Sequence, residues 1–200
     1  MIEPKTISEA AAALKKGGVI LYPTDTLYGL GADALHAEAV RKVYEIKGRP
    51  TGKPMHIVVA DMAMAARYAE ITPSARGLAE RLLPGALTIL LKAKPGFPAE
   101  LLAGGETIGI RIPNNAFCLE LARAFDGPFT ATSANKSGGS NCLSVGEARI
   151  SLADSFKEIS YVVDGGILPE SLPSTVVDAT GEAPVIIREG ALSAETIIKR

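Results

Sequence analysis

The sequence predicts an α/β fold with a mixed β-sheet and flanking helices. Short apolar segments of strand length alternate with amphipathic segments, and the last third lacks a strict βαβ rhythm. Aromatic residues make up only 5% of the 200 residues and Trp is absent, whereas hydrophobic residues reach 47%. The core is therefore expected to consist of Ala, Val, Ile and Leu, as in helices packed on strands that are covered on both faces. No repeat or linker divides the chain, so we expect residues 1–200 to form one domain.

Capping residues and the helical spacing of apolar side chains predict the helices. Thr6 and Glu9 have the spacing of a capping box at the start of the first helix, and Gly17 follows its end. Gly48 closes the second helix. The expected helices span residues 6–16, 37–47, 62–69, 73–83, 114–125, 145–153 and 194 onward, with Asp61, Thr72, Ser144 and Ser193 as caps.

Short apolar runs bounded by turn residues predict the strands. Pro23 ends the first run because proline cannot donate a ladder hydrogen bond, and residues 24–26 follow as a polar loop. The expected strands span residues 19–22, 56–60, 87–91, 107–112, 129–132, 161–163, 175–177 and 185–187.

The overall charge argues mildly against a protein devoted to duplex nucleic acid. Lys and Arg number 21 against 22 acidic residues, which gives a net charge of −1 and an isoelectric point near 6.2. The distribution is uneven, because residues 41–53 hold five basic side chains against Glu45 alone, whereas residues 140–182 are predominantly acidic. A near-neutral total therefore conceals a basic patch.

Cysteine usage and hydropathy indicate a cytosolic protein. Cys118 and Cys142 form no CxxC motif, so both are expected to be small apolar core residues in a reducing compartment. No run of apolar residues is long enough to span a membrane, and residues 1–5 do not resemble a signal peptide. We therefore expect no membrane association.

Common cofactor and metal motifs do not account for the sequence. Residues 29–34 match G-x-G-x-x-A, but these glycines do not follow a strand directly, and basic residues 49–53 stand where the ribose-binding acid would be. Walker A, HExxH and GxSxG sequences are absent, and His36 and His56 lie twenty residues apart. We therefore predict no metal site and no Rossmann site.

The basic run at residues 47–56 is more informative. Two glycines and two prolines shape it into a turn that leads directly into an apolar strand, and it carries Lys47, Arg49 and Lys53. Such a loop at the edge of an α/β sheet can bind an anionic ligand, although a solvated loop is the equally simple alternative.

Two arginines on predicted strands point to the same chemistry. In residues 107–112, strand alternation places Thr107, Gly109 and Arg111 on one face and three isoleucines on the other, and Gly109 leaves room for a ligand near the backbone. Arg188 follows another apolar strand. Each alone is equally consistent with an exposed, snorkelling side chain. Together with the basic run they favour a polyanion or a carboxylate, which Arg binds in bidentate fashion.

The segment 132–139 supplies small polar groups after a strand. Its hydroxyls, side-chain amide and backbone N–H groups suit a phosphate or a sugar, although an ordinary Ser/Asn/Gly turn explains them as well. Ser174 and Thr175 at the start of another strand give a weaker signal of the same kind.

Taken together, these motifs resemble those of the YrdC-type threonylcarbamoyl-adenylate synthases. The resemblance extends in order from about residue 16 to residue 190. It is carried by residues 23–31 (PTDTLYGLG), 47–56 (KxR…KPxH), 111, 133–138 (SANKSG), 174–178 (STVVD) and 188–190 (REG).

The resemblance implies a YrdC-like twisted mixed sheet with a concave basic cleft. It further implies an enzyme that converts L-threonine, bicarbonate and ATP into L-threonylcarbamoyl-AMP and pyrophosphate, with Mg²⁺ carried mainly by the nucleotide phosphates. Partner transferase proteins would pass the threonylcarbamoyl group to tRNA, which this enzyme serves indirectly.

Residue roles follow from the same resemblance. The residues implied to be catalytic and to hold the ATP phosphates are Lys47 and Arg49. The residues implied to bind threonine are Thr24, His56, Arg111, Ala131 and Ser174. The residues implied to complete the nucleotide site are Thr51, Thr107, Ser133, Asn135, Asn141 and Arg188. The family commonly has prolines after the segment matching Ser137 and Gly138, whereas this chain continues Gly139-Ser140-Asn141-Cys142.

Two alternatives stay open at this point. A basic concave surface of this fold could bind duplex RNA, although the low aromatic content and the isoelectric point argue against that as the main role. A paralogue with another carbamoyl or nucleotide activity is the second alternative. Threonine-dependent release of pyrophosphate from ATP separates the synthase from both.

Overall fold

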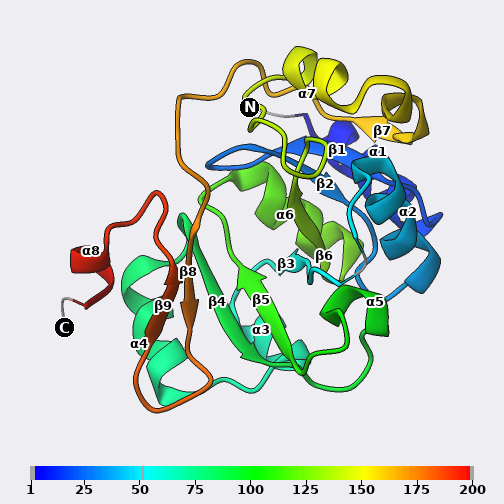
Figure 1. The fold of residues 1–200 in the computed structure, drawn as a ribbon. Helices are drawn as coiled ribbons and strands as arrows, with labels where there is room; N and C mark the ends of the chain where they lie inside the picture. Colours follow the sequence, from blue (N-terminus) through cyan, green and yellow to red (C-terminus); the bar gives the residue numbers. More distant parts are fainter. Residues whose placement is uncertain (1–2, 51, 199–200) are drawn as a thin grey trace.

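The computed structural model describes residues 3–50 and 52–198, and in them nine strands form one twisted mixed sheet (Figure 1). The strand order is β7-β1-β2-β6-β3-β5-β4-β8-β9. Three neighbouring pairs are parallel, namely β1 with β7, β3 with β5 and β4 with β8, and the other pairs are antiparallel. The strands are β1 (Ile20–Pro23), β2 (Tyr28–Gly31), β3 (His56–Val58), β4 (Leu87–Lys92), β5 (Thr107–Arg111), β6 (Phe129–Ser133), β7 (Tyr161–Val162), β8 (Thr175–Asp178) and β9 (Val185–Arg188). The predicted mixed α/β sheet is confirmed.

Helices flank this sheet, and a long connection from β7 to β8 runs between its two ends (Figure 1). The helices are α1 (Pro4–Lys15), α2 (Ala37–Lys47), α3 (Met62–Tyr68), α4 (Pro73–Leu82), α5 (Ala99–Leu102), α6 (Ala116–Phe125), α7 (Val145–Leu152), the 3₁₀ helix η1 (Ala153–Glu158) and α8 (Ala194–Ile198).

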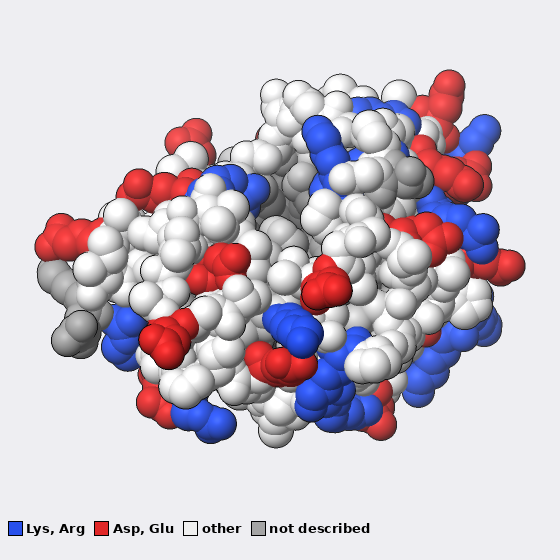
Figure 2. Space-filling model, turned by 60° about the horizontal axis from the view of Figure 1, so that its bottom comes forward, with Lys and Arg blue, Asp and Glu red and all other residues white. Residues whose placement is uncertain are grey.

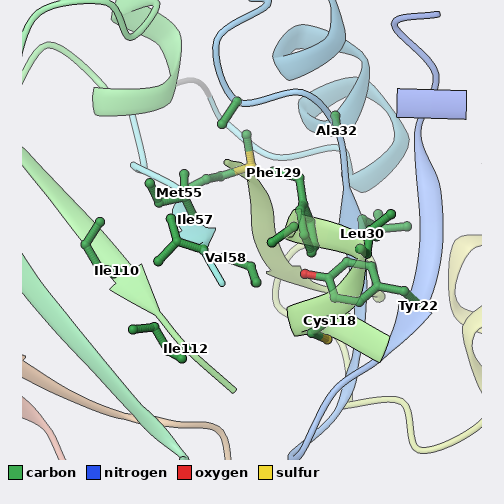
Figure 3. Packing of buried hydrophobic residues seen from close by; sticks show 14 of the residues in the cluster. Tyr22, Leu30, Ala32, Met55, Ile57, Val58, Ile110, Ile112, Cys118 and Phe129 are labelled. Carbon is green, nitrogen blue, oxygen red and sulfur yellow. The ribbon is translucent and has the colours of Figure 1, made fainter. Parts of the chain in front are cut away.

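The core is built as the composition predicts, from aliphatic side chains with a few large rings. Tyr22 of β1 and Phe129 of β6 pack edge to face with ring centroids 5.2 Å apart, close to Leu30 and Cys118 (Figure 3). The buried Tyr22 hydroxyl donates to the Thr130 carbonyl oxygen at 3.0 Å, which satisfies its polar group.

Most predicted caps are present. The side chains of Asp61, Thr72 and Ser144 accept hydrogen bonds from the first turns of α3, α4 and α7, and Gly48 ends α2 in the left-handed conformation. The capping box at Thr6 is wrong. Helix α1 starts earlier, at residue 4. Proline is tolerated there because a backbone N–H in the first turn of a helix has no acceptor within the helix, so its absence costs nothing.

The first half of the G-x-G-x-x-A segment lies in an antiparallel strand, which the sequence did not predict. Gly29 and Gly31 lie in β2 opposite β1, and a Cβ at either position would come within 3.0 Å of the Tyr22 ring. These glycines therefore make room for Tyr22. The short helix α5 was also not predicted.

Both cysteines are free and buried, as predicted. Among the described residues, no helix is sufficiently long and apolar to cross a bilayer.

Candidate active site

A cavity of about 280 Å³ opens where the β1–β2 turn, β3, β5 and β6 face the start of β8 and the end of β9. Figure 2 shows a hollowed face of the molecule with Lys and Arg side chains on both sides of the hollow. The lining residues are Tyr22, Thr24, Thr26, Leu27, Tyr28, Gly29, Arg49, Pro54, Met55, His56, Arg111, Ala131, Thr132, Ser133, Asn141, Pro173, Ser174 and Arg188.

Three arginines and no carboxylate line this cavity among the described residues. Arg49 is held by the carbonyl oxygens of Lys53 and Pro54, the latter at 2.7 Å from Nη2. Arg188 donates to the Ser174 carbonyl oxygen at 2.8 Å. Burial lowers the pKa of both guanidinium groups, and repulsion from Arg111 adds to the effect at Arg188. The cavity is therefore a positive site suited to anionic groups.

Arg111 has a different partner from the other two arginines. Its Nη2 lies 2.6 Å from Oδ1 of Asp25, and each side chain of this pair is only 9% exposed. The second carboxylate oxygen of Asp25 accepts the Asn114 backbone N–H at 3.0 Å. The pair thus joins the β1–β2 turn to the end of β5 and to the start of α6, and it fixes the guanidinium.

His56 fills the space that the sequence analysis left open above Gly109. A Cβ on Gly109 would lie 2.5 Å from Cδ2 of His56 and 3.0 Å from Cγ2 of Thr88. The expectation that Gly109 leaves room for a ligand is therefore wrong, because its missing side chain makes room for the imidazole. Burial, followed by the three nearby arginines, lowers the pKa of His56 to about 3, so the ring is neutral at physiological pH.

Thr24 lines the cavity, but its hydroxyl shapes the turn. Oγ1 donates to the Leu27 carbonyl oxygen at 2.7 Å and accepts the backbone N–H groups of Thr26 and Leu27. Thr26 Oγ1 lies 3.5 Å from Nη2 of Arg111, so the turn also contacts the arginine.

Lys47 lies outside the cavity lining. Only 2% of the residue is exposed, and its ammonium donates to the carbonyl oxygens of Ser133 and Asn135, the latter at 2.7 Å. Burial, with a smaller contribution from Arg49, lowers its pKa to about 7. Lys47 therefore ties the end of α2 to the segment that follows β6.

The predicted residues of β6 and of the segment that follows it fall into two groups. Ala131, Ser133 and Asn141 line the cavity. Asn135 does not, because its amide turns back to the Gly139 carbonyl oxygen at 2.6 Å and to Lys47.

Ser174 reaches the cavity from the opposite wall. Its hydroxyl lies 2.8 Å from that of the buried Thr88.

Thr107 lies apart from the other predicted residues. Thr107 is exposed at the first position of β5, about 13 Å along the strand from Arg111, and it does not line the cavity. Thr51 lies outside the described residues.

Sequence reasoning missed Asp25 as a site residue, together with Tyr22 and Thr26. Asp25 stands between two threonines in a turn directly after a buried strand. A carboxylate at a strand end, in a chain whose candidate ligands are arginines, was the available signal.

The chain is similar to proteins of a known family. The family model Sua5_yciO_yrdC, described as telomere recombination, matches residues 12–190. A Bacillus subtilis (strain 168) relative named threonylcarbamoyl-AMP synthase is 38% identical over 193 residues, which make up 96% of this chain and 55% of the relative. The chain thus spans little more than half the length of that relative.

Solved structures agree with this assignment. P. abyssi Sua5 complexed with L-threonine has a TM-score of 0.92 and 35% identity, over 98% of this chain and 57% of that one. E. coli YciO has a TM-score of 0.87 and 30% identity, over 99% of this chain and 95% of that one. The family resemblance of the motifs is thereby confirmed, and the chain belongs to the Sua5/YciO/YrdC family.

Proposed function

We propose that this chain is an L-threonylcarbamoyladenylate synthase. The threonine amine takes up the carbon of bicarbonate to give a carbamate, and water is released. A carbamate oxygen then attacks the α-phosphorus of ATP, and the bond from that phosphorus to the departing pyrophosphate breaks. The products are L-threonylcarbamoyl-AMP and pyrophosphate. The name of the B. subtilis relative and the threonine bound to P. abyssi Sua5 support this proposal.

The observation that carries the proposal is the cavity lined by three arginines without a carboxylate among the described residues. Every substrate of the reaction is an anion or carries a carboxylate, and charge builds up on the pyrophosphate as it leaves. Fixed guanidinium groups in a partly buried site stabilise such charge without further reorganisation. Positioning and positive charge can therefore supply most of the catalysis without a covalent nucleophile.

We assign the threonine end of the cavity to Thr24, His56, Arg111 and Ala131, with Ser174 across from them. Arg111 is the partner for the threonine carboxylate. His56 is neutral and too weakly basic to remove a proton near neutral pH, so we assign it a hydrogen-bonding role.

We assign the phosphates to Arg49 and Arg188, and the rest of the nucleotide to the Ser133 and Asn141 wall. Lys47 can bind phosphate only if Nζ exchanges its carbonyl partners for phosphate oxygens. Mg²⁺ enters as part of the nucleotide substrate, because the described lining residues offer it no carboxylate.

The wider setting is part of the same proposal. The product passes to transferase proteins that modify tRNA, and the reaction takes place in the cytosol, in keeping with two free cysteines. Residues 1–200 act as one catalytic domain.

The test is pyrophosphate release from ATP in bicarbonate buffer, measured with and without L-threonine. Release should require threonine, and L-serine or L-valine should substitute poorly. Release that does not depend on threonine contradicts the proposal.

A paralogue with a different carbamoyl or nucleotide activity is the second candidate. It is favoured by the match to E. coli YciO, which is nearly the same length as this chain. Pyrophosphate release that depends on ATP and bicarbonate but not on threonine, with another amine or carbamoyl donor required, would support it.

A further inference from the structure

We propose that Asp25 is a positioning residue that aims Arg111 at the carboxylate of the amino-acid substrate. This inference rests on the proposed function. The observation behind it is that one of the three cavity arginines is held by a buried carboxylate, whereas the other two are held by carbonyl oxygens.

Asp25 acts from behind the cavity wall. Thr24 and Thr26 line the cavity, but Asp25 between them does not. Both of its carboxylate oxygens are occupied, one by Nη2 of Arg111 at 2.6 Å and one by the Asn114 N–H at 3.0 Å. Contact with substrate is therefore not its role, and any effect on the reaction passes through Arg111.

The pair leaves a defined part of the guanidinium for a ligand. Nη2 is bound to Asp25, and Nε is buried without a hydrogen-bond partner. Nη1 makes no hydrogen bond to another described residue. Because the guanidinium is planar and rigid, fixing Nη2 also fixes the direction of Nη1.

Removing the carboxylate has two opposite consequences. Arg111 loses the partner that orients it, so a ligand that needs one direction of approach binds less well. The cavity also gains one net positive charge, because Arg111 is no longer neutralised, so anions bound mainly by charge bind equally well or more tightly. General damage to the site would weaken both kinds of ligand.

Asp25→Asn tests this because it keeps the shape of the side chain and removes its charge. We expect the KM for L-threonine in the pyrophosphate-release assay to rise by about tenfold or more. This is the loss of affinity that corresponds to the loss of one charge-assisted hydrogen bond. Inhibition by inorganic pyrophosphate should stay the same or become stronger. Asp25→Glu, which retains the carboxylate, should recover part of the threonine affinity.

Asp126→Asn is the matched control. Asp126 also pairs with an arginine, Arg67, at 2.9 Å, but at the surface, and its side chain is 77% exposed. This variant should leave both the threonine KM and pyrophosphate inhibition unchanged.

The outcomes separate the two proposals. If the wild-type protein releases pyrophosphate without threonine dependence, the proposed function fails and this inference fails with it. If the wild type depends on threonine but Asp25→Asn has the same threonine KM, only the inference is overturned. Equal loss of threonine and pyrophosphate binding in Asp25→Asn, with no recovery in Asp25→Glu, assigns Asp25 to folding alone and also overturns it.

Discussion

Replacing Gly109 by Ala should displace the His56 imidazole that lines the cavity. The added Cβ would lie 2.5 Å from Cδ2 and 2.8 Å from Cγ of that ring. Carbon atoms in contact are normally about 3.5–4.0 Å apart, so the ring must shift by about 1 Å. Overpacking of this kind costs about 1–3 kcal/mol of unfolding free energy. A misplacement of that size at a site can lower activity by about 100-fold.

Urea denaturation and the threonine-dependent release of pyrophosphate measure these two effects. We expect Gly109→Ala to lose stability and to lose kcat/KM for threonine, while the KM for ATP changes less. Gly77→Ala is the matched control, since a Cβ there meets nothing within 4 Å. That change within α4 should stabilise the protein by about 0.5–1 kcal/mol. If Gly109→Ala loses neither stability nor kcat/KM, as expected for Gly77→Ala, the close packing of His56 on Gly109 does not determine the position of the imidazole.

Arg111, His56 and Lys47 can each be tested by one substitution. Arg111→Ala should raise the threonine KM by the equivalent of about 2–5 kcal/mol, because it also leaves Asp25 without its partner; an unchanged threonine KM refutes its role. The pKa of His56 is about 3 in the folded state, against an ordinary value of 6.5. Between pH 6.5 and 3 the imidazole is therefore protonated in the unfolded state but not in the folded state, so the free energy of unfolding falls as the pH decreases through this range. His56→Gln should remove this part of the acid destabilisation in pH-dependent denaturation, and an identical pH profile contradicts it. Lys47→Met should lower stability by about 1–3 kcal/mol by leaving the Ser133 and Asn135 carbonyl oxygens unpaired; calorimetry should show a larger loss of affinity for ATP than for threonine, and equal losses would leave Lys47 a scaffold only.

The three arginines of the site could be predicted from the sequence because each stands in a pattern that is visible locally. Arg111 and Arg188 end apolar strands, and Arg49 follows a helix closed by Gly48. Strand alternation and capping are local properties, so they are visible without a fold. The mixed sheet and most helix caps could be predicted for the same reason.

The polar partners of Arg111 and Lys47 could not be predicted, because they come from distant parts of the chain. The sequence predicted Lys47 as part of a basic run that binds an anion, yet its ammonium donates hydrogen bonds to carbonyl oxygens more than eighty residues away. Gly109 looked like an opening, yet the imidazole of His56 from the neighbouring strand β3 fills it. A sequence identifies chemical groups, but only the fold determines which of their atoms are already used.

The different partners of the three arginines give them different properties, which match the two kinds of substrate in the proposed reaction. Arg49 and Arg188 are held by neutral oxygen atoms, so each keeps its full positive charge, which favours a polyanion such as a triphosphate. Arg111 is paired with Asp25 and therefore adds less to the field than the other two arginines, but its direction is fixed. A single carboxylate on a small amino acid needs direction more than field, because one charge gains little from distant cations in a partly solvated cleft. In the proposed reaction, the carboxylate behind Arg111 would thus separate recognition of the amino acid from attraction of the nucleotide within one cavity.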